Sequence, residues 1–240
     1  KILREVSCRL SQSGLVLSGD KCKLCCDQVD YLGHTITAKR IAPKSSLVES
    51  IKSAPAPIDK DQLRSFLGLC EYYSKFVKDF ATIMEPIRKL LRKDVQFCWE
   101  KEQQLVFDKI KSLIIQAPIL RLFSSGAPGI ITTDASSYSL GAVLNQGSQK
   151  NHWTIAFASR TLSKTERKYS VIEKELLACV WAIEHFRHYV WGTRFSLNTD
   201  HKPLVAILSA GGGRTSTARI ARLCSRLQEY HFDVVYVPGW

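Results

Sequence analysis

The order of apolar segments in the second half of the chain restricts the possible folds more than any other feature. Three short segments with strand character, separated by polar turns, are followed by a long helical stretch and then by a strand, a helix and a last strand. The segments are Gly129–Thr133, Gly141–Leu144, Thr154–Ala158, Ser170 to Val190, Phe195–Thr199, Thr217–Tyr230 and Phe232–Val237. The order βββαβαβ predicts an α/β domain with a mixed five-stranded sheet and flanking helices.

The first half predicts a smaller α+β part. Residues 1–43 have the pattern of short strands and turns, with a compact apolar piece at Gly14–Gly19 and hairpin-like alternation over Val29–Ile36. A proline-rich stretch follows, and Asp59 with Gln62 forms a helix-start signature. Apolar residues at helical spacing then predict a small helical module over residues 59–93.

Two further boundaries follow from local signals in this half. Pro86 is expected to open another short helix, because proline is favoured in the first helical turn. Beyond it, Trp99-Glu100 leads into a helix that Ala117-Pro118 should stop.

Bulk composition excludes some classes of protein. The 240 residues suffice for two domains, and 45% hydrophobic residues argue against disorder. No apolar run approaches the ~20 residues of a membrane span, so no membrane role is expected. The net charge of +12 suits contact with phosphates but also occurs in proteins that never bind nucleic acid.

The eight cysteines are scattered, which fits reduced thiols in an intracellular, cytoplasmic or nuclear setting better than a disulfide framework. The cluster of Cys22, Cys25 and Cys26 lacks a matched second ligand pair, so no zinc site is predicted.

Two aspartates directly follow predicted strands. Asp134 comes after the first strand of the second half and Asp200 after the fourth. If these strands are parallel neighbours, both carboxylates lie at the sheet edge where α/β proteins place their sites. The alternative is that each aspartate only caps a turn.

The long helix offers three candidates for a third acid. Glu173 fits a capping box with Ser170 and has a structural role on that basis, whereas Glu184 is expected to be solvated. Glu175 lies at the margin of the apolar stripe that should meet the sheet, where a carboxylate needs a partner or a cation. Three converging carboxylates would repel one another, and Mg²⁺, or Mn²⁺ in its place, would relieve that repulsion.

An ordered series of motifs runs through nearly the whole chain. They are Tyr31-Leu-Gly-His34, Phe66-Leu-Gly-Leu-Cys-Glu-Tyr-Tyr-Ser-Lys-Phe76, Thr133-Asp-Ala-Ser136, Gly141-Ala-Val-Leu144, Tyr169-Ser-Val-Ile-Glu-Lys-Glu-Leu-Leu-Ala178 and Thr199-Asp-His-Lys-Pro-Leu204. In content and order this series resembles the Pol polyproteins of gypsy-type long-terminal-repeat (LTR) retrotransposons.

The resemblance implies a domain plan and an activity. Residues 1–43 would be the end of the reverse transcriptase palm with its primer-grip hairpin, 44–95 the helical thumb, 96–125 the connection and 126–240 an RNase H-like domain. That domain would hydrolyse the RNA strand of RNA/DNA hybrids by two-metal-ion chemistry. The resemblance makes Asp134, Glu175 and Asp200 the catalytic, metal-binding acids, and Tyr31, Gly33 and His34 part of the contact with primer-template nucleic acid.

The same resemblance also implies what a fragment of Pol would lack. The Tyr-x-Asp-Asp polymerase motif is expected upstream of Lys1 and a fourth RNase H acid beyond Trp240, so activity of this piece is open. The other partner would be the rest of the polyprotein, in the cytoplasm within a virus-like particle or in the nucleus; the oligomeric state is left open. The rival hypothesis is an inactive retroelement relic that binds nucleic acid or protein.

A basic helix face and one histidine complete the candidate residues. Arg219, Arg222 and Arg226 recur on one face of the last helix and could form a rail for phosphates, or only a solvated basic face. His201, beside Asp200, could help release product or could cap a turn.

Overall fold

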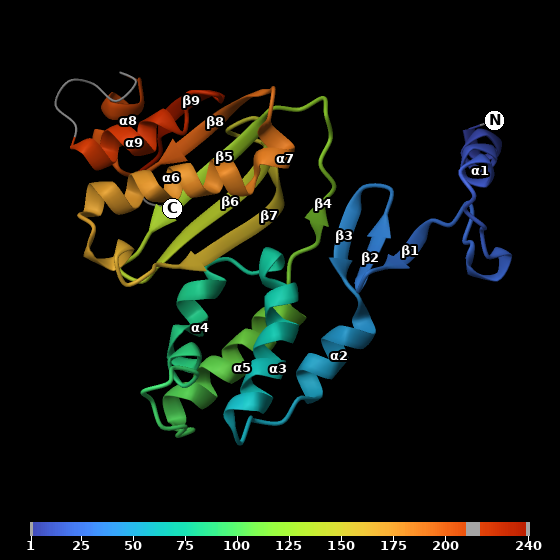
Figure 1. Cartoon of the computed structure of the whole chain (residues 1–240), viewed down its shortest axis with the longest axis horizontal. Coiled ribbons are helices and arrows are strands. Elements are labelled where there is room, and N and C mark those ends of the chain that lie inside the picture. Colours follow the sequence, from blue (N-terminus) through green and yellow to red (C-terminus); the bar gives the residue numbers. More distant parts are fainter. Residues whose placement is uncertain (1, 210–216, 239–240) are drawn as a thin grey trace.

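The computed structural model describes residues 2–209 and 217–238. Two hydrophobic cores organise it, one between a five-stranded sheet and its helices and one within a helical module. Figure 1 shows the sheet above the helical module, with a small second sheet and the amino-terminal helix to one side. Gly239 and Trp240 lie outside the described residues.

The large sheet has the strand order β7-β6-β5-β8-β9. Its strands are β5 Gly129–Ala135, β6 Ser139–Gly147, β7 His152–Thr161, β8 Arg194–Thr199 and β9 His231–Tyr236. The first three form an antiparallel meander, and β8 and β9 then add in parallel to β5. The predicted mixed five-stranded α/β sheet is confirmed.

Helix α6, Val171–His185, lies across one face of this sheet (Figure 1). Its packing face is almost wholly apolar, and Cys179 on it meets Thr133 of β5, with 3.4 Å between sulfur and hydroxyl oxygen. The predicted long helix is divided near Phe186, after which the short α7 runs from Arg187 to Val190. Helices α8, Lys202–Ser209, and α9, Ala218–Ser225, join β8 to β9 and pack beside α6.

The helical module encloses the second core, which includes Leu63, Tyr73 and Phe107. Its helices are α2 Ser45–Ser53, α3 Lys60–Tyr72, α4 Phe80–Lys89 and α5 Lys101–Ile115, with a 3₁₀ turn at Ser74–Phe76. Asp59 caps α3 as predicted by accepting hydrogen bonds from the backbone N–H groups of residues 61 and 62. The prediction for Pro86 was wrong, because it lies inside α4, whose buried face holds the helix together around it.

The amino-terminal region combines a helix with a small antiparallel sheet, β1-β2-β3-β4. Its elements are α1 Ile2–Gln12, a 3₁₀ turn at Gly19–Lys21, β1 Gln28–Tyr31, β2 His34–Thr37, β3 Arg40–Pro43 and β4 Leu120–Arg121. The strand character expected from residue 1 onwards was wrong for α1, where Leu3, Val6 and Leu10 follow a helical period. Residues 14–18 form no strand either, whereas Val29–Ile36 spans two strands and the turn between them.

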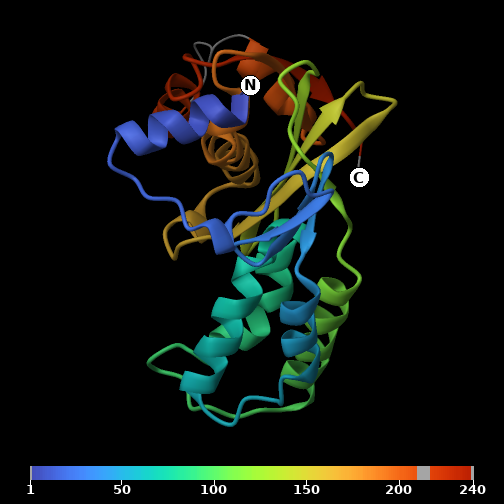
Figure 2. The ribbon, with the colours of Figure 1, turned by 90° about the vertical axis from the view of Figure 1, so that its right-hand side faces the viewer.

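The helical module is docked onto the β6–β7 side of the large sheet through the start of α4. The Ala81 backbone N–H donates to Ser159 Oγ at 2.9 Å, and the hydroxyl groups of Thr82 and Ser139 are hydrogen-bonded. An ion pair between Arg167 and the buried Glu85 adds a charged contact at 3.3 Å. In the turned view of Figure 2 the helices stand directly below the large sheet.

Within the described ranges, the helices are all too short or too polar to span a membrane.

The connection from β7 to α6 is held by a paired carboxylate, which makes stability dependent on pH. Arg160 donates two hydrogen bonds of 2.8 Å to Glu166, and the Ser163 backbone N–H donates a third at 2.8 Å. The contact with Arg160 is the main reason that the pKa of Glu166 falls to about 2. Glu166→Gln should therefore lower the free energy of unfolding at pH 7 by about 1–3 kcal/mol.

This loss should shrink as the pH falls from the ordinary carboxyl pKa of 4.5 towards about 2, because protonation removes the same charge from the unsubstituted protein. Urea unfolding at a series of pH values measures the difference, with the exposed Glu229→Gln as control. A difference that does not change with pH would contradict the assigned role of Glu166.

Candidate active site

Asp134 and Asp200 lie at the carboxyl ends of neighbouring parallel strands. Thr132 of β5 pairs with Asn198 of β8, so two residues further along each strand the two aspartates come level at one edge of the sheet. This is the placement that the sequence predicted.

Glu175 reaches the same edge from α6. Its side chain is buried, with the residue only 6% exposed, and its Oε2 has no hydrogen-bond partner among residues 2–209 and 217–238. Burial, followed by the charges of Asp134 and Asp200, raises the pKa of Glu175 to about 8. A buried carboxyl oxygen without a partner is costly unless a proton or a cation compensates it.

The two other glutamates of α6 are already paired. Glu173 closes the predicted capping box by accepting from the Ser170 backbone N–H at 3.0 Å, and Arg219 donates to its other oxygen at 2.8 Å. Glu184, which was expected to be solvated, is partly exposed and accepts two hydrogen bonds from Arg226 at the surface. Of these three glutamates, Glu175 is the one whose carboxyl lies near Asp134 and Asp200. Asp134, Glu175 and Asp200 together form the acidic group.

A further acid, Asp79, comes from the helical module. Although part of Asp134 is exposed, burial raises the pKa of its carboxyl, and the charges of Asp200 and Asp79 add to this effect, whereas Lys78 opposes it. Sequence reasoning missed Asp79, since no local pattern links it to a strand more than fifty residues later. Asp79 lies close to Asp134 because of the way α4 packs on β6 and β7.

The acidic group fits a hard divalent cation in its chemistry. Carboxylate oxygens are the preferred ligands of Mg²⁺, and the unpartnered Oε2 of Glu175 beside two mutually repelling aspartates is the environment that a cation stabilises. Within the described ranges, however, no three His, Cys, Asp or Glu side chains are gathered closely enough to enclose an ion. Because Mg²⁺ keeps several of its waters, the carboxylates need not all touch it.

The arginines predicted as a phosphate rail are partly engaged within the protein. Arg219 pairs with Glu173 and also lies over the Tyr169 ring, 4.1 Å from its centroid, while Arg226 pairs with Glu184. Arg222 donates to the Ala218 carbonyl and is exposed. Arg219 and Arg226 thus link α9 and its carboxyl end to α6, whereas Arg222 contacts its own helix. Contact of the three side chains with phosphates stays a prediction.

His201 lies at the start of α8, next to Asp200. Its backbone N–H donates to Thr199 Oγ1 at 3.1 Å, and its carbonyl accepts from the Leu204 N–H at 2.9 Å. These contacts form the turn that the alternative hypothesis expected, and both use backbone atoms of His201. A role of the ring in product release stays a prediction.

The Tyr31-Leu-Gly-His34 motif forms the turn of the β1–β2 hairpin. Leu32 and Gly33 both have positive φ, 43° and 71°, as a two-residue hairpin turn requires. The Tyr73 hydroxyl donates to the Gly33 carbonyl at 3.0 Å, and the Tyr72 hydroxyl donates to the Leu32 carbonyl. The hairpin turn is therefore fixed to the end of α3.

The two aromatic members of the motif have opposite environments. His34 is 8% exposed and stacks on Tyr72 with 5.0 Å between ring centroids, and its burial lowers its pKa. Tyr31 is 61% exposed and is free to meet a ligand. Of the three residues predicted here to contact nucleic acid, Tyr31 presents its side chain outward, whereas Gly33 shapes the turn and His34 packs.

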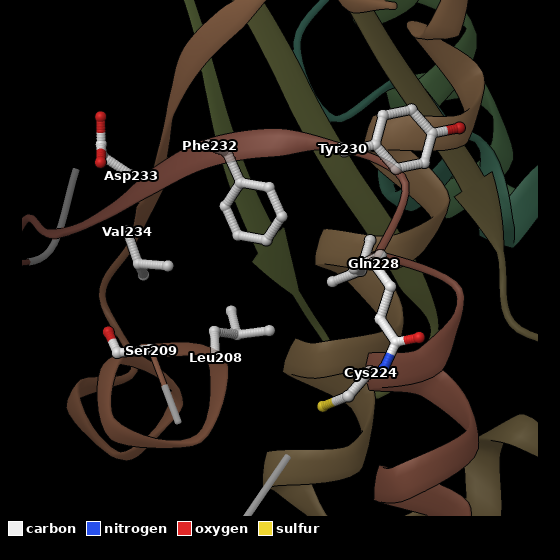
Figure 3. Close-up of a pocket in the computed structure, with 9 residues that line it drawn as sticks. Leu208, Ser209, Cys224, Gln228, Tyr230, Phe232, Asp233 and Val234 are labelled. Atoms are coloured by element: carbon white, nitrogen blue, oxygen red, sulfur yellow. The ribbon is translucent and has the colours of Figure 1, made fainter. Parts of the chain in front are cut away.

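A cavity of about 480 Å³ lies elsewhere, between α8, α9 and β9. Figure 3 shows the Phe232 ring pointing into it while Asp233 points away, towards its ion pair with Arg194. None of the predicted acids is among the described residues that line this cavity, so it is separate from the acidic group.

Comparison with known sequences gives consistent matches. The family of RNase H-like domains found in reverse transcriptase matches residues 99–197. The chain is 40% identical, over 96% of its length, to the retrovirus-related Pol polyprotein from transposon 297 of Drosophila melanogaster, and 37% identical over its full length to that from transposon 412. It spans about a fifth of these relatives, 21% and 19% of their lengths.

Solved structures with the same fold include two of the foamy viral protease-reverse transcriptase. The complex with RNA/DNA hybrid matches all of this chain and 33% of that one, with a TM-score of 0.80 and 22% identity. The dRH form in complex with double-stranded DNA matches with the same TM-score and identity and is covered to 43%. At this identity the likeness establishes the fold, including the arrangement of sheet and helical module.

The hairpin turn yields a stability prediction. A Cβ on Gly33 would meet Tyr72 Cε1 at 3.0 Å and Leu47 Cδ1 at 3.1 Å, in a backbone conformation that L residues rarely adopt. Gly33→Ala should therefore destabilise the protein by about 1–3 kcal/mol.

The matched control is Gly68→Ala in α3, where nothing lies within 4 Å of the added Cβ and stability should rise by about 0.5–1 kcal/mol. Both changes are measured by chemical denaturation. Equal effects of the two substitutions would show that the turn is not held as described.

Proposed function

Because the chain belongs to the Pol polyproteins of LTR retrotransposons and carries their RNase H-like domain, we propose that this domain hydrolyses the RNA strand of RNA/DNA hybrids during reverse transcription. The observation that carries the proposal is the buried, unpartnered carboxyl oxygen of Glu175 beside Asp134 and Asp200, at the ends of two parallel strands. A buried carboxyl oxygen without a partner destabilises the fold, and a bound cation would compensate this cost.

Asp134, Glu175 and Asp200 are the residues that would hold Mg²⁺. When bound, a pair of such ions supplies an activated water for in-line attack on a phosphodiester and stabilises the leaving oxygen. The protein contributes rigid placement, since Asp134 and Asp200 follow paired strands and Glu175 is fixed on a helix packed against them. Because Glu175 is buried, bulk water has no access to the acidic group from the side of α6.

Nucleic acid would be held by contacts outside the acidic group. The foamy viral enzymes with this fold were solved with double-stranded DNA and with RNA/DNA hybrid, and we extend that kind of ligand to this chain. The exposed Tyr31 would contact primer-template nucleic acid, and the exposed Arg222 would contact phosphates. An RNase H needs little base sequence, because it senses backbone shape and 2′-hydroxyl groups.

The test compares two glutamates on the same helix. Glu175→Gln should reduce Mg²⁺-dependent cleavage of a labelled RNA/DNA hybrid by at least about 100-fold, because it removes a charge from the cation site. Glu173→Gln should retain cleavage, because glutamine can still close the capping box with Ser170. Cleavage is followed on gels, with single-stranded RNA as the substrate control.

Two results would contradict the proposal. One is equal loss in both variants, which would point to helix stability rather than to the site. The other is absence of hybrid cleavage by the unsubstituted, folded chain while it still binds hybrid, which would favour a binding relic.

A further inference from the structure

We propose that Asp79, which the helical module supplies, is an additional carboxylate beside the divalent-cation site of Asp134, Glu175 and Asp200, so that the docked module helps to hold the cation. The inference rests on the proposed function, because it adds a residue to the same site. It assigns Asp79 a positioning role towards the cation and its waters.

The contact of Asp79 with the sheet places its carboxylate beside Asp134. Asp79 Oδ1 lies 3.1 Å from the point where a Cβ on Gly141 would stand. Gly141 of β6 is the register partner of Asp134, and paired residues of an antiparallel ladder direct their side chains to the same face. The glycine therefore leaves the space that the Asp79 carboxylate occupies, on the face to which Asp134 points.

The conformation of Asp79 shows that its carboxylate is not used for helix capping. Asp79 precedes α4 with φ 54° and ψ 27°, and its side chain accepts no hydrogen bond from the backbone of residues 80–89, all of which are described. Asp59, in the same position before α3, is extended and accepts two such bonds. The backbone of Asp79 instead adopts the left-handed region, which costs energy for a residue other than glycine.

The docking of α4 fixes this placement. The Ala81 N–H donates to Ser159 of β7, the register partner of Gly141, and Thr82 contacts Ser139 of β6, two register pairs further along. The start of α4 is thus tied to β6, which carries Gly141, and to its neighbour β7. The docking of α4 therefore determines where the Asp79 carboxylate lies.

The carboxylate of Asp79 adds to the repulsion among the neighbouring acids, which is unfavourable unless a positive charge compensates it. The charge of Asp79 adds to the repulsion at Asp134, and Lys78 offsets this in part. The independent sign of a ligand is Glu175, which is more than nine-tenths buried and whose Oε2 lacks a partner throughout the described residues. A partly hydrated divalent cation would compensate the charge of Asp79 and give Glu175 Oε2 a partner, because Mg²⁺ binds carboxylates directly or through its waters.

The test measures thermal unfolding of the whole chain as a function of Mg²⁺ concentration, with EDTA as the reference. We compare the unsubstituted protein with Asp79→Asn, Asp134→Asn and the control Asp61→Asn, which changes an exposed aspartate of α3. Asparagine tolerates the left-handed conformation, so the backbone of Asp79 should be kept. Asp79→Asn should raise the Mg²⁺ concentration needed for half-maximal stabilisation about tenfold without lowering Tm in EDTA.

A second variant tests the geometry. Gly141→Ala places a methyl group against the Asp79 carboxylate and should also weaken Mg²⁺ stabilisation, whereas in the Asp79→Asn background it should have little further effect. Additive effects of the two substitutions would contradict the contact.

The remaining outcomes separate the two proposals. If Asp134→Asn abolishes the Mg²⁺ effect while Asp79→Asn behaves like the unsubstituted protein and Asp61→Asn, the role of Asp79 is wrong and the three-acid site stands. If Mg²⁺ does not stabilise the unsubstituted protein at all, the cation site and the role of Asp79 fail together.

Discussion

Repulsion between carboxylates at the ends of β5 and β8 is the constraint around which this part of the chain is built. Asp134 and Asp200 are level on parallel strands, and α6 adds Glu175 from the buried side. The packing that buries Glu175 is the same packing that forms the main core, so the fold bears the cost of the acidic group. A divalent cation would convert this cost into binding energy.

The second organising contact is the docking of α4 on the β6–β7 side of the sheet. Backbone and hydroxyl hydrogen bonds at its start, together with the ion pair of Arg167 with buried Glu85, set the position of the helical module. Because Asp79 lies at this start, the position of the module and the charge of the acidic group are physically linked. The hairpin turn, held by Tyr72 and Tyr73, is attached to the same module.

The sequence predicted most of what depends on local pattern. Strand alternation and the capping pair of Ser170 with Glu173 led to the correct sheet and helix, and strand-end positions led to Asp134 and Asp200. It failed at Pro86, where tertiary packing overrides a local preference, and at residues 2–12, where a helical period was overlooked. The sequence could not predict the position of Asp79, because this position depends on a contact between segments that are distant along the chain.

If Asp79 of the helical module lies at one cation site with Asp134, Glu175 and Asp200, a bound ion should be visible at these carboxylates. Crystals of the chain grown with Mn²⁺, measured at a wavelength where manganese scatters anomalously, test it most directly. We expect an anomalous peak bonded to carboxylate oxygens of Asp134, Asp200 or Glu175, with Asp79 beside it directly or through water. A well-occupied manganese peak elsewhere, with these carboxylates free of metal, would contradict it.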